Sequence, residues 1–152
     1  MIDVRAKLAE LGWTLPIAAT PVAAYVPAIQ TGNLVFTAGQ LPIVEGKIVA
    51  IGKVGKDVSV HDAKKLAQIC ALNCLAAVQT VVEVNTIAKI VRVVGYINGM
   101  PGFVNQSDVV NSASELFLYI WGEAGKHARS SIGVSELPLS SPLEIELTVE
   151  ID

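Results

Sequence analysis

The sequence predicts an α+β domain in which two helices cover one face of a mixed sheet. The clearest sign is the last segment, 143–151, where apolar and polar residues alternate as in a strand with one buried face. Two long segments with helical spacing, 59–82 and 105–122, separate segments that favour strands. The expected order of elements is therefore β-β-α-β-α-β-β, and 152 residues suit one domain, 1–152.

The first expected elements are short. A helix over 4–11 is favoured because the Asp3 side chain can accept a hydrogen bond at its N-terminus. The proline-rich stretch that follows is expected to be extended. Strands are expected over 33–38, which is apolar and β-branched, and around 48–51, which follows a glycine turn.

The first long helix is expected to begin at Ser59, with Asp62 in its first turn, and to run to about Val82. It carries Cys70 and Cys74 four residues apart. At that helical spacing Cβ atoms are about 5–6 Å apart, whereas a disulfide needs about 3.8 Å. We expect two reduced core cysteines, and no further Cys or His pair completes a metal site, so no metal is expected.

The second half of the chain repeats the strand–helix–strand pattern. Residues 88–97 are rich in Ile and Val, which favours a strand. Asn105 or Asp108 is expected to cap the second long helix, which ends near Gly122. A further strand is expected over 129–134 before the final one.

Composition narrows the function classes. With 11 Lys and Arg against 14 Asp and Glu, the net charge is −3, and the chain lacks the basic surface of a nucleic-acid-binding protein. Charged residues make up only 16% of the chain and hydrophobic residues 52%. This is more apolar material than the core of a single subunit needs. We therefore expect a homo-oligomer whose interfaces bury the excess.

The long uncharged segments are not expected to cross a membrane. Residues 11–44 are interrupted by prolines, and 66–82 contains polar side chains and is barely long enough. The N-terminal residues do not resemble a signal peptide, so the expected location is the cytoplasm. The sequence carries no phosphate-binding loop or dinucleotide motif, and no cofactor is expected.

Arg129 and Glu144 are the candidate site. Arg129 lies at the head of a strand in apolar company, where a guanidinium needs an acceptor such as a carboxylate. Glu144 lies on the polar face of the last strand, and a hairpin-like return through 138–142 can bring the two strands side by side. One interpretation is a structural ion pair. The other is a site where Arg129 fixes a small carboxylate and Glu144 handles a water molecule or proton.

Several segments, taken in order, resemble the RidA/YjgF family of reactive-intermediate deaminases, also called the endoribonuclease L-PSP family. The resemblance covers essentially the whole chain after Leu11, and it is closest to a branch with a longer N-terminus and a His-Ala-Arg motif. The matching segments are 25–26, 32–42 (GNLVFTAGQLP), 128–131 (ARSS), 137–138 and 144–146.

This resemblance implies a chorismate-mutase-like fold and a homotrimer with clefts between its subunits. It also implies hydrolysis of small 2-imino or enamine acids, such as 2-aminoacrylate, to 2-keto acids and ammonia without metal or cofactor. In this chain the family's functional residues correspond to the carboxylate-binding Arg129, the water-directing Glu144, the cleft residues Tyr25 and Asn111 (the latter if one residue is inserted in that helix), and backbone groups near Gly39 and Ser131.

Three positions leave alternatives open. Ala38 stands where the best-known members have Ser, and Ser131 stands where they have Cys, which affects substrate choice. His127 can line the cleft and donate a proton, or it can pack at the helix–strand junction and bond a backbone carbonyl.

Three functions remain in view. The first is an enamine/imine deaminase, and the second is a binding module for small carboxylates that has little turnover. The third, an endoribonuclease, is disfavoured by the net charge of −3.

Overall fold

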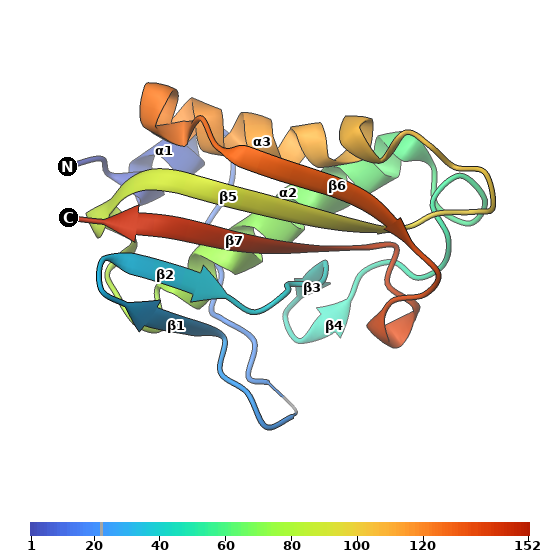
Figure 1. Ribbon diagram of the computed structural model, residues 1–152, viewed down its shortest axis with the longest axis horizontal. Coiled ribbons are helices and arrows are strands. Elements are labelled where there is room, and N and C mark those ends of the chain that lie inside the picture. Colours follow the sequence, from blue (N-terminus) through green and yellow to red (C-terminus); the bar gives the residue numbers. More distant parts are fainter. Residues whose placement is uncertain (22) are drawn as a thin grey trace.

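The predicted α+β architecture is confirmed. The computed structural model describes residues 1–21 and 23–152. Helices α2 (Val60–Val78) and α3 (Gln106–Trp121) lie together behind one face of a five-stranded sheet, and the short helix α1 (Val4–Glu10) contacts α3 (Figure 1). The strands stand in the order β1 (Ala28–Thr31), β2 (Leu34–Thr37), β7 (Leu143–Ile151), β5 (Ile87–Asn98) and β6 (Ala128–Val134).

Strand β5 is the centre of the C-terminal half of the sheet. It pairs in parallel with β6 and antiparallel with β7, so β6 and β7 do not touch each other as strands. The predicted hairpin-like return that places Arg129 and Glu144 on adjacent strands is therefore wrong. Most of β5 is buried, which favours a strand on each side of it, and the 135–142 connection crosses its end, where Asn98 donates to the Ser141 carbonyl.

A lysine helps to hold this crossing in place. The Lys53 ammonium donates to Asn98 Oδ1 at 2.6 Å and to the Ser135 carbonyl at 2.7 Å, and it lies 3.4 Å from Glu136. The connection between β6 and β7 is thus tied to the end of β5 by charge-assisted hydrogen bonds.

The early strands differ from the prediction. Strand β2 lies where it was expected, but 48–51 does not form a strand of the main sheet. There, β4 (Lys47–Ile48) pairs only with β3 (Ile43–Val44), in a small hairpin of its own. The first strand of the main sheet is instead β1, which follows the proline-rich stretch and was not predicted.

The helix starts were predicted well and one helix end was not. The Asp3 and Ser59 side chains accept hydrogen bonds from the backbone N–H groups of Ala6 and Asp62, as N-caps do. Helix α2 ends at Val78, four residues before the expected end. The Thr80 hydroxyl donates to the Ala77 carbonyl at 2.7 Å, which satisfies a carbonyl of the last turn and closes the helix.

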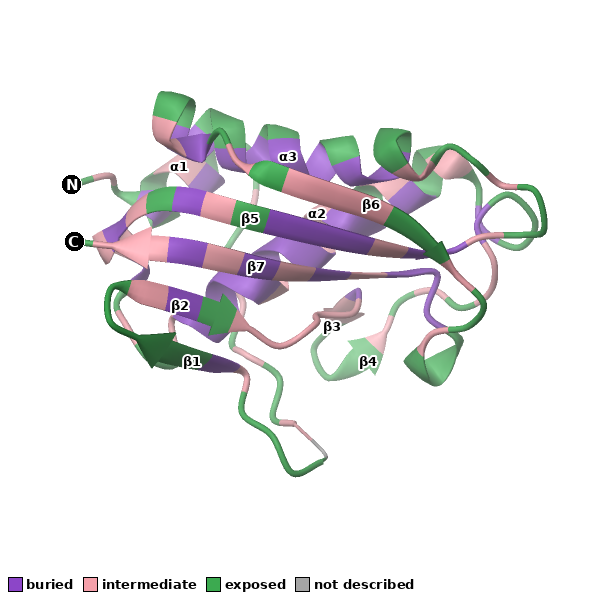
Figure 2. Cartoon of the chain, viewed as in Figure 1, coloured by how far each residue is buried: buried purple, intermediate pink, exposed green. Residues whose placement is uncertain are grey.

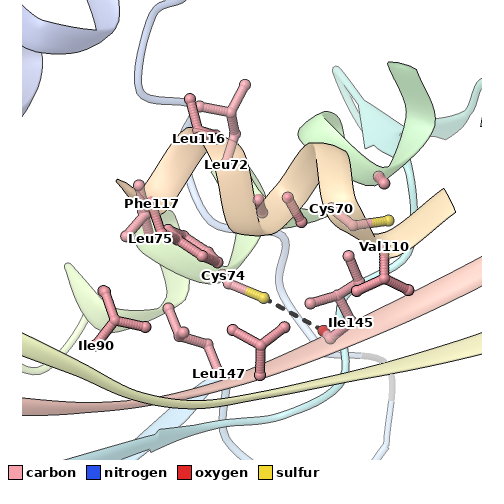
Figure 3. Packing of buried hydrophobic residues seen from close by; sticks show 14 of the residues in the cluster. Cys70, Leu72, Cys74, Leu75, Ile90, Val110, Leu116, Phe117, Ile145 and Leu147 are labelled. Carbon is pink, nitrogen blue, oxygen red and sulfur yellow. Dashed lines mark hydrogen bonds between the residues drawn. The ribbon is translucent and has the colours of Figure 1, made fainter. Parts of the chain in front are cut away.

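The core lies between the two long helices and the sheet (Figure 3). Cys70 and Cys74 are free thiols buried in it, as expected, and Cys74 Sγ donates to the Ile145 carbonyl at 3.2 Å. Burial raises the pKa of both thiols well above the ordinary value. Helix α3 packs directly on β5, because a Cβ added at Gly95 would collide with Val110.

A bulge interrupts the pairing of β2 with β7. Phe36 is opposite Thr148, whereas Gln40 is opposite Ile145, so the β2 side carries one extra residue. Within this stretch the Leu147 N–H donates to the Thr37 hydroxyl at 3.0 Å instead of to a backbone carbonyl. The extra residue falls in the Ala38–Gly39 region, beside the strand that carries Glu144.

The face of the sheet away from the helices carries both apolar side chains and the carboxyl groups of Glu144 and Glu146. Ile29, Phe36 and Ile132 are 61%, 40% and 44% exposed there, although each is large and apolar. Figure 2 shows buried positions along much of β5 and, in alternation, along β7, whereas the edge strand β6 has only intermediate and exposed positions. No helix within the described residues is long and apolar enough to cross a membrane.

Candidate functional site

Arg129 is held by helix α3. Its strand position, opposite the buried Val93, directs the side chain to the helix side of the sheet. There Nη1 donates to Asn111 Oδ1 at 2.8 Å and to Ser114 Oγ at 3.1 Å, and Nη2 donates to the Ser107 carbonyl at 3.4 Å. All three acceptors are uncharged.

The guanidinium charge is therefore not neutralised by any side chain that the structure describes. Among the described residues no carboxylate lies within ion-pair distance of Arg129. A guanidinium has five N–H donors, and three of them are used here, which leaves one on Nε and one on Nη2. Nε and Nη2 form one edge of the guanidinium, the arrangement that binds a carboxylate through two parallel hydrogen bonds.

A groove of about 300 Å³ opens beside this guanidinium. Its lining contains no acidic side chain, and its positive charge comes from Arg129, because Lys126 pairs with Glu123 at 2.8 Å. A small anion would meet an attractive potential at this position. The lining residues are Asn111, Ser114, Leu118, Lys126, His127 and Arg129.

His127 takes part in this groove and in the helix–strand junction. Its Nδ1 lies 2.6 Å from the Gly125 carbonyl oxygen, which is the backbone contact considered in the sequence analysis. Its Nε2 lies 2.8 Å from Ser114 Oγ, the same atom that accepts from Arg129. Asn111, Ser114, His127 and Arg129 together are called the arginine half-site below.

Glu144 lies elsewhere, on the open face of β7. It is opposite Tyr96 and half-buried, and burial raises its pKa, with a smaller contribution from the nearby charge of Glu146. Burial also raises the pKa of Tyr96, again with a contribution from Glu146. A carboxyl group in such surroundings takes up a proton more readily than an exposed one, which suits general acid–base chemistry.

Gly39 packs against this carboxyl group. A Cβ at Gly39 would lie 2.7 Å from both Cδ and Oε1 of Glu144, so no larger residue fits without displacing it. The bulge described above brings the Gly39 backbone to this position. Gly39, Glu144 and Glu146 are called the glutamate half-site below.

One chain does not bring the two half-sites together. Strand β5 separates β6 from β7, and the pairing places Arg129 on the helix side and Glu144 on the open side. Tyr25, which is 55% exposed, precedes β1 at the opposite edge of the sheet from β6. The predicted site residues therefore fall into separate groups on the surface of one chain.

The other predicted positions have clear places. Ser131 is opposite Gly95 on the helix side, and its Oγ is buried with no hydrogen-bond partner among the described residues. Ala38 is next to Gly39 in the bulge, where its N–H donates to the Pro27 carbonyl at 2.8 Å. Asn111 contacts Arg129 directly.

The sequence analysis missed Ser107 and Ser114. Ser107, Asn111 and Ser114 are spaced by four and three residues, so they share one face of helix α3. This polar row on one face of α3 was a usable signal. It indicates where a charged side chain of the adjacent strand finds its acceptors.

Comparisons with known proteins agree with this architecture. Residues 5–151 match the model of the YjgF/chorismate mutase-like family, which its description connects with endoribonucleases. Protein TCP17 of Trypanosoma cruzi is 33% identical over 151 residues, which cover 98% of this chain and 94% of that protein.

Two crystal structures are similar over nearly the whole chain. Atu1372 of Agrobacterium tumefaciens, a protein of unknown function, is 40% identical with a TM-score of 0.90, covering 98% of this chain and 93% of that one. A protein of Shewanella oneidensis, named as an endoribonuclease, is 30% identical with a TM-score of 0.92, covering 97% and 99%.

Proposed function

Because the chain belongs to the YjgF/chorismate mutase-like family, we propose that it hydrolyses small 2-imino or enamine acids to 2-keto acids and ammonia. The observation that carries this proposal is Arg129, whose charge is held in place by neutral groups and left uncompensated. The donors that remain on its Nε and Nη2 suit the carboxylate that all these substrates share.

The proposed site is shared between subunits of a homotrimer. The arginine and glutamate half-sites lie on opposite faces of one chain, so a small substrate can touch both only if a second copy supplies one of them. The exposed apolar side chains on the open face, such as Phe36 and Ile132, supply surface for such an interface.

The chemistry requires little beyond positioning and proton transfer. The enamine first tautomerises to the imine, and Arg129 then orients the imine by its carboxylate. Water adds to the imine carbon while Glu144 accepts a proton from it and returns a proton to the nitrogen. The resulting carbinolamine passes its hydroxyl proton through Glu144 to the amino nitrogen, the C–N bond breaks as the C=O bond forms, and ammonia leaves the 2-keto acid.

Turnover of 2-aminoacrylate, generated in the assay, tests the proposal. The wild type should accelerate pyruvate and ammonia formation above the uncatalysed rate, and Arg129→Ala should lose at least about tenfold in kcat/KM, as expected when a charged hydrogen bond is removed. Arg5→Ala is the matched control, because Arg5 lies on the surface outside the arginine half-site, where it pairs with Glu83. Equal rates for Arg129→Ala and wild type would contradict the proposal.

Binding without turnover is the second candidate. The arginine half-site is complete in one chain and needs no contribution from Glu144 to hold an anion. Saturable binding of pyruvate with no acceleration of 2-aminoacrylate hydrolysis would favour this function. An RNA substrate should stay intact, because a chain with a net charge of −3 lacks the basic surface that binds a polyanion.

A further inference from the structure

Arg129, Ser114, His127 and the Gly125 carbonyl form a continuous chain of hydrogen bonds. The distances are 3.1 Å from Arg129 Nη1 to Ser114 Oγ, 2.8 Å from Ser114 Oγ to His127 Nε2, and 2.6 Å from His127 Nδ1 to the carbonyl oxygen. Each of these lengths is within the normal hydrogen-bond range. The chain joins α3, the turn after it and β6.

For a neutral imidazole, the two ends of this chain fix the direction of every bond in it. A carbonyl oxygen can only accept, so the proton of the neutral imidazole lies on Nδ1 and Nε2 is left as an acceptor. A guanidinium can only donate, so Ser114 Oγ must accept from Arg129. The serine hydroxyl proton is then free to point at Nε2, and all groups are satisfied.

The imidazole itself has little freedom. Its ring packs nearly perpendicular to Phe117, with ring centroids 6.1 Å apart and an interplanar angle of 86°. The turn that supplies the carbonyl is fixed as well, because a Cβ at Gly125 would lie 2.5 Å from the Phe117 carbonyl oxygen. Ser114 Oγ, which accepts from Arg129, is thus oriented by an imidazole that is itself fixed by the Gly125 carbonyl and by Phe117.

We infer that Ser114 and His127 are positioning residues that aim Arg129 at the substrate carboxylate without neutralising it. This inference rests on the proposed role of Arg129. A carboxylate in the place of Ser114 would hold the guanidinium more tightly but would compete with the substrate for its charge. A neutral serine, itself oriented by a neutral imidazole, holds the guanidinium and leaves the charge for the ligand.

Pyruvate binding to the assembled protein, measured by isothermal titration calorimetry, tests this role. Ser114→Ala and His127→Leu should each weaken binding about tenfold, the equivalent of one modest hydrogen bond. The double variant should be no weaker than either single variant, because the two residues act in series. A defect in packing alone would instead give independent, additive losses.

Two variants serve as controls. His127→Gln should bind within about threefold of wild type, because a carboxamide oxygen can replace Nε2 as the acceptor. His61→Gln, at an exposed position in the first turn of α2, should bind like wild type. In the deaminase assay Ser114→Ala should raise KM more than it lowers kcat, since the carboxylate is held in both the ground and transition states.

Nitrogen NMR of the wild-type imidazole provides a test that needs no variant. It should show His127 protonated on Nδ1 and unprotonated on Nε2. The opposite tautomer would overturn the inference, as would wild-type pyruvate affinity in Ser114→Ala while Arg129→Ala loses binding. Unchanged binding in Arg129→Ala would instead refute the proposed function, so the two failures can be told apart.

Discussion

At the scale of single residues, the two candidate catalytic side chains are held in opposite ways. The charge of Arg129 is left uncompensated because its partners Asn111, Ser114 and the Ser107 carbonyl are neutral. Glu144 is half-buried beside Glu146, so its charged form is disfavoured. One half-site therefore offers a ready cation and the other a carboxyl group that binds a proton easily, which are the two properties that imine hydrolysis needs.

Glu144 should reduce the stability of the fold. Its raised pKa means that the folded protein keeps the proton to higher pH than the unfolded chain does, so stability falls as pH rises from the ordinary glutamate value through the raised one. Glu144→Gln should remove this loss and stabilise the protein at neutral pH by less than about 1 kcal/mol, since solvent screens the exposed part of the group.

Denaturant unfolding at several pH values measures this effect. Glu115→Gln, at an exposed position on α3, is the control and should not change the pH profile. The Glu144→Gln variant should at the same time lose turnover of 2-aminoacrylate. A variant that loses stability at neutral pH would mean that Glu144 is stabilised by an interaction across the subunit interface.

The buried hydroxyl of Ser131 should contribute nothing to stability. Its Oγ has no partner among the described residues, and an unsatisfied buried hydroxyl costs about 1–3 kcal/mol. Ser131→Ala should therefore leave the melting temperature unchanged or raise it. Ser141→Ala is the matched comparison, because its buried hydroxyl donates to the Leu143 carbonyl at 2.7 Å, and its removal should cost about 1 kcal/mol. Equal losses in both variants would contradict this account.

At the scale of elements, the helices and strands with a regular apolar pattern were predictable from the sequence, but the pairing of the strands was not. The alternation in β7 and the apolar face of α2 identified those elements because each pattern is local. The place of β1 in the sheet depends on its partner β2, which its own four residues do not specify. The separation of Arg129 from Glu144 could not be predicted either, since it depends on β5 lying between their strands.

The contact between α3 and β5 depends on Gly95. A side chain there would collide with Val110, so Gly95→Ala should push the helix away from the sheet and cost about 1–3 kcal/mol. Gly133→Ala on β6 is the control, because a Cβ there would meet only the flexible end of Gln106, at 3.0 Å, and should cost less than about 0.5 kcal/mol. Thermal unfolding of both variants checks this, and equal melting temperatures would contradict it.

At the scale of the whole molecule, one chain carries the two half-sites on different surfaces. The arginine half-site opens beside the edge strand β6, and the glutamate half-site lies on the open face over β7. The amphipathic character of that open face gives each copy a surface that another copy can cover. Oligomerisation would then complete the site as well as stabilise the fold.

Mixing two inactive variants tests this arrangement. Arg129→Ala and Glu144→Gln should each be inactive alone, but after joint refolding about a quarter of the clefts should combine one intact arginine with one intact glutamate of a neighbour, by random assembly. Recovery of activity on mixing is the expected result. The same mixture without refolding is the control, because its subunits are not redistributed between oligomers. If activity did not recover after refolding, both residues would have to act from one chain.

The extra residue in the Ala38–Gly39 region has a consequence for how the protein could be altered. A chain shortened by one residue here could pair regularly along β7, with a carbonyl taking the place of the Thr37 hydroxyl as partner of the Leu147 N–H. Such a deletion would make a more orderly ladder and would remove the glycine backbone that packs against Glu144. Engineering for thermal robustness at this position would therefore act directly against the proposed catalysis, and the irregular strand is the part of the scaffold to leave untouched.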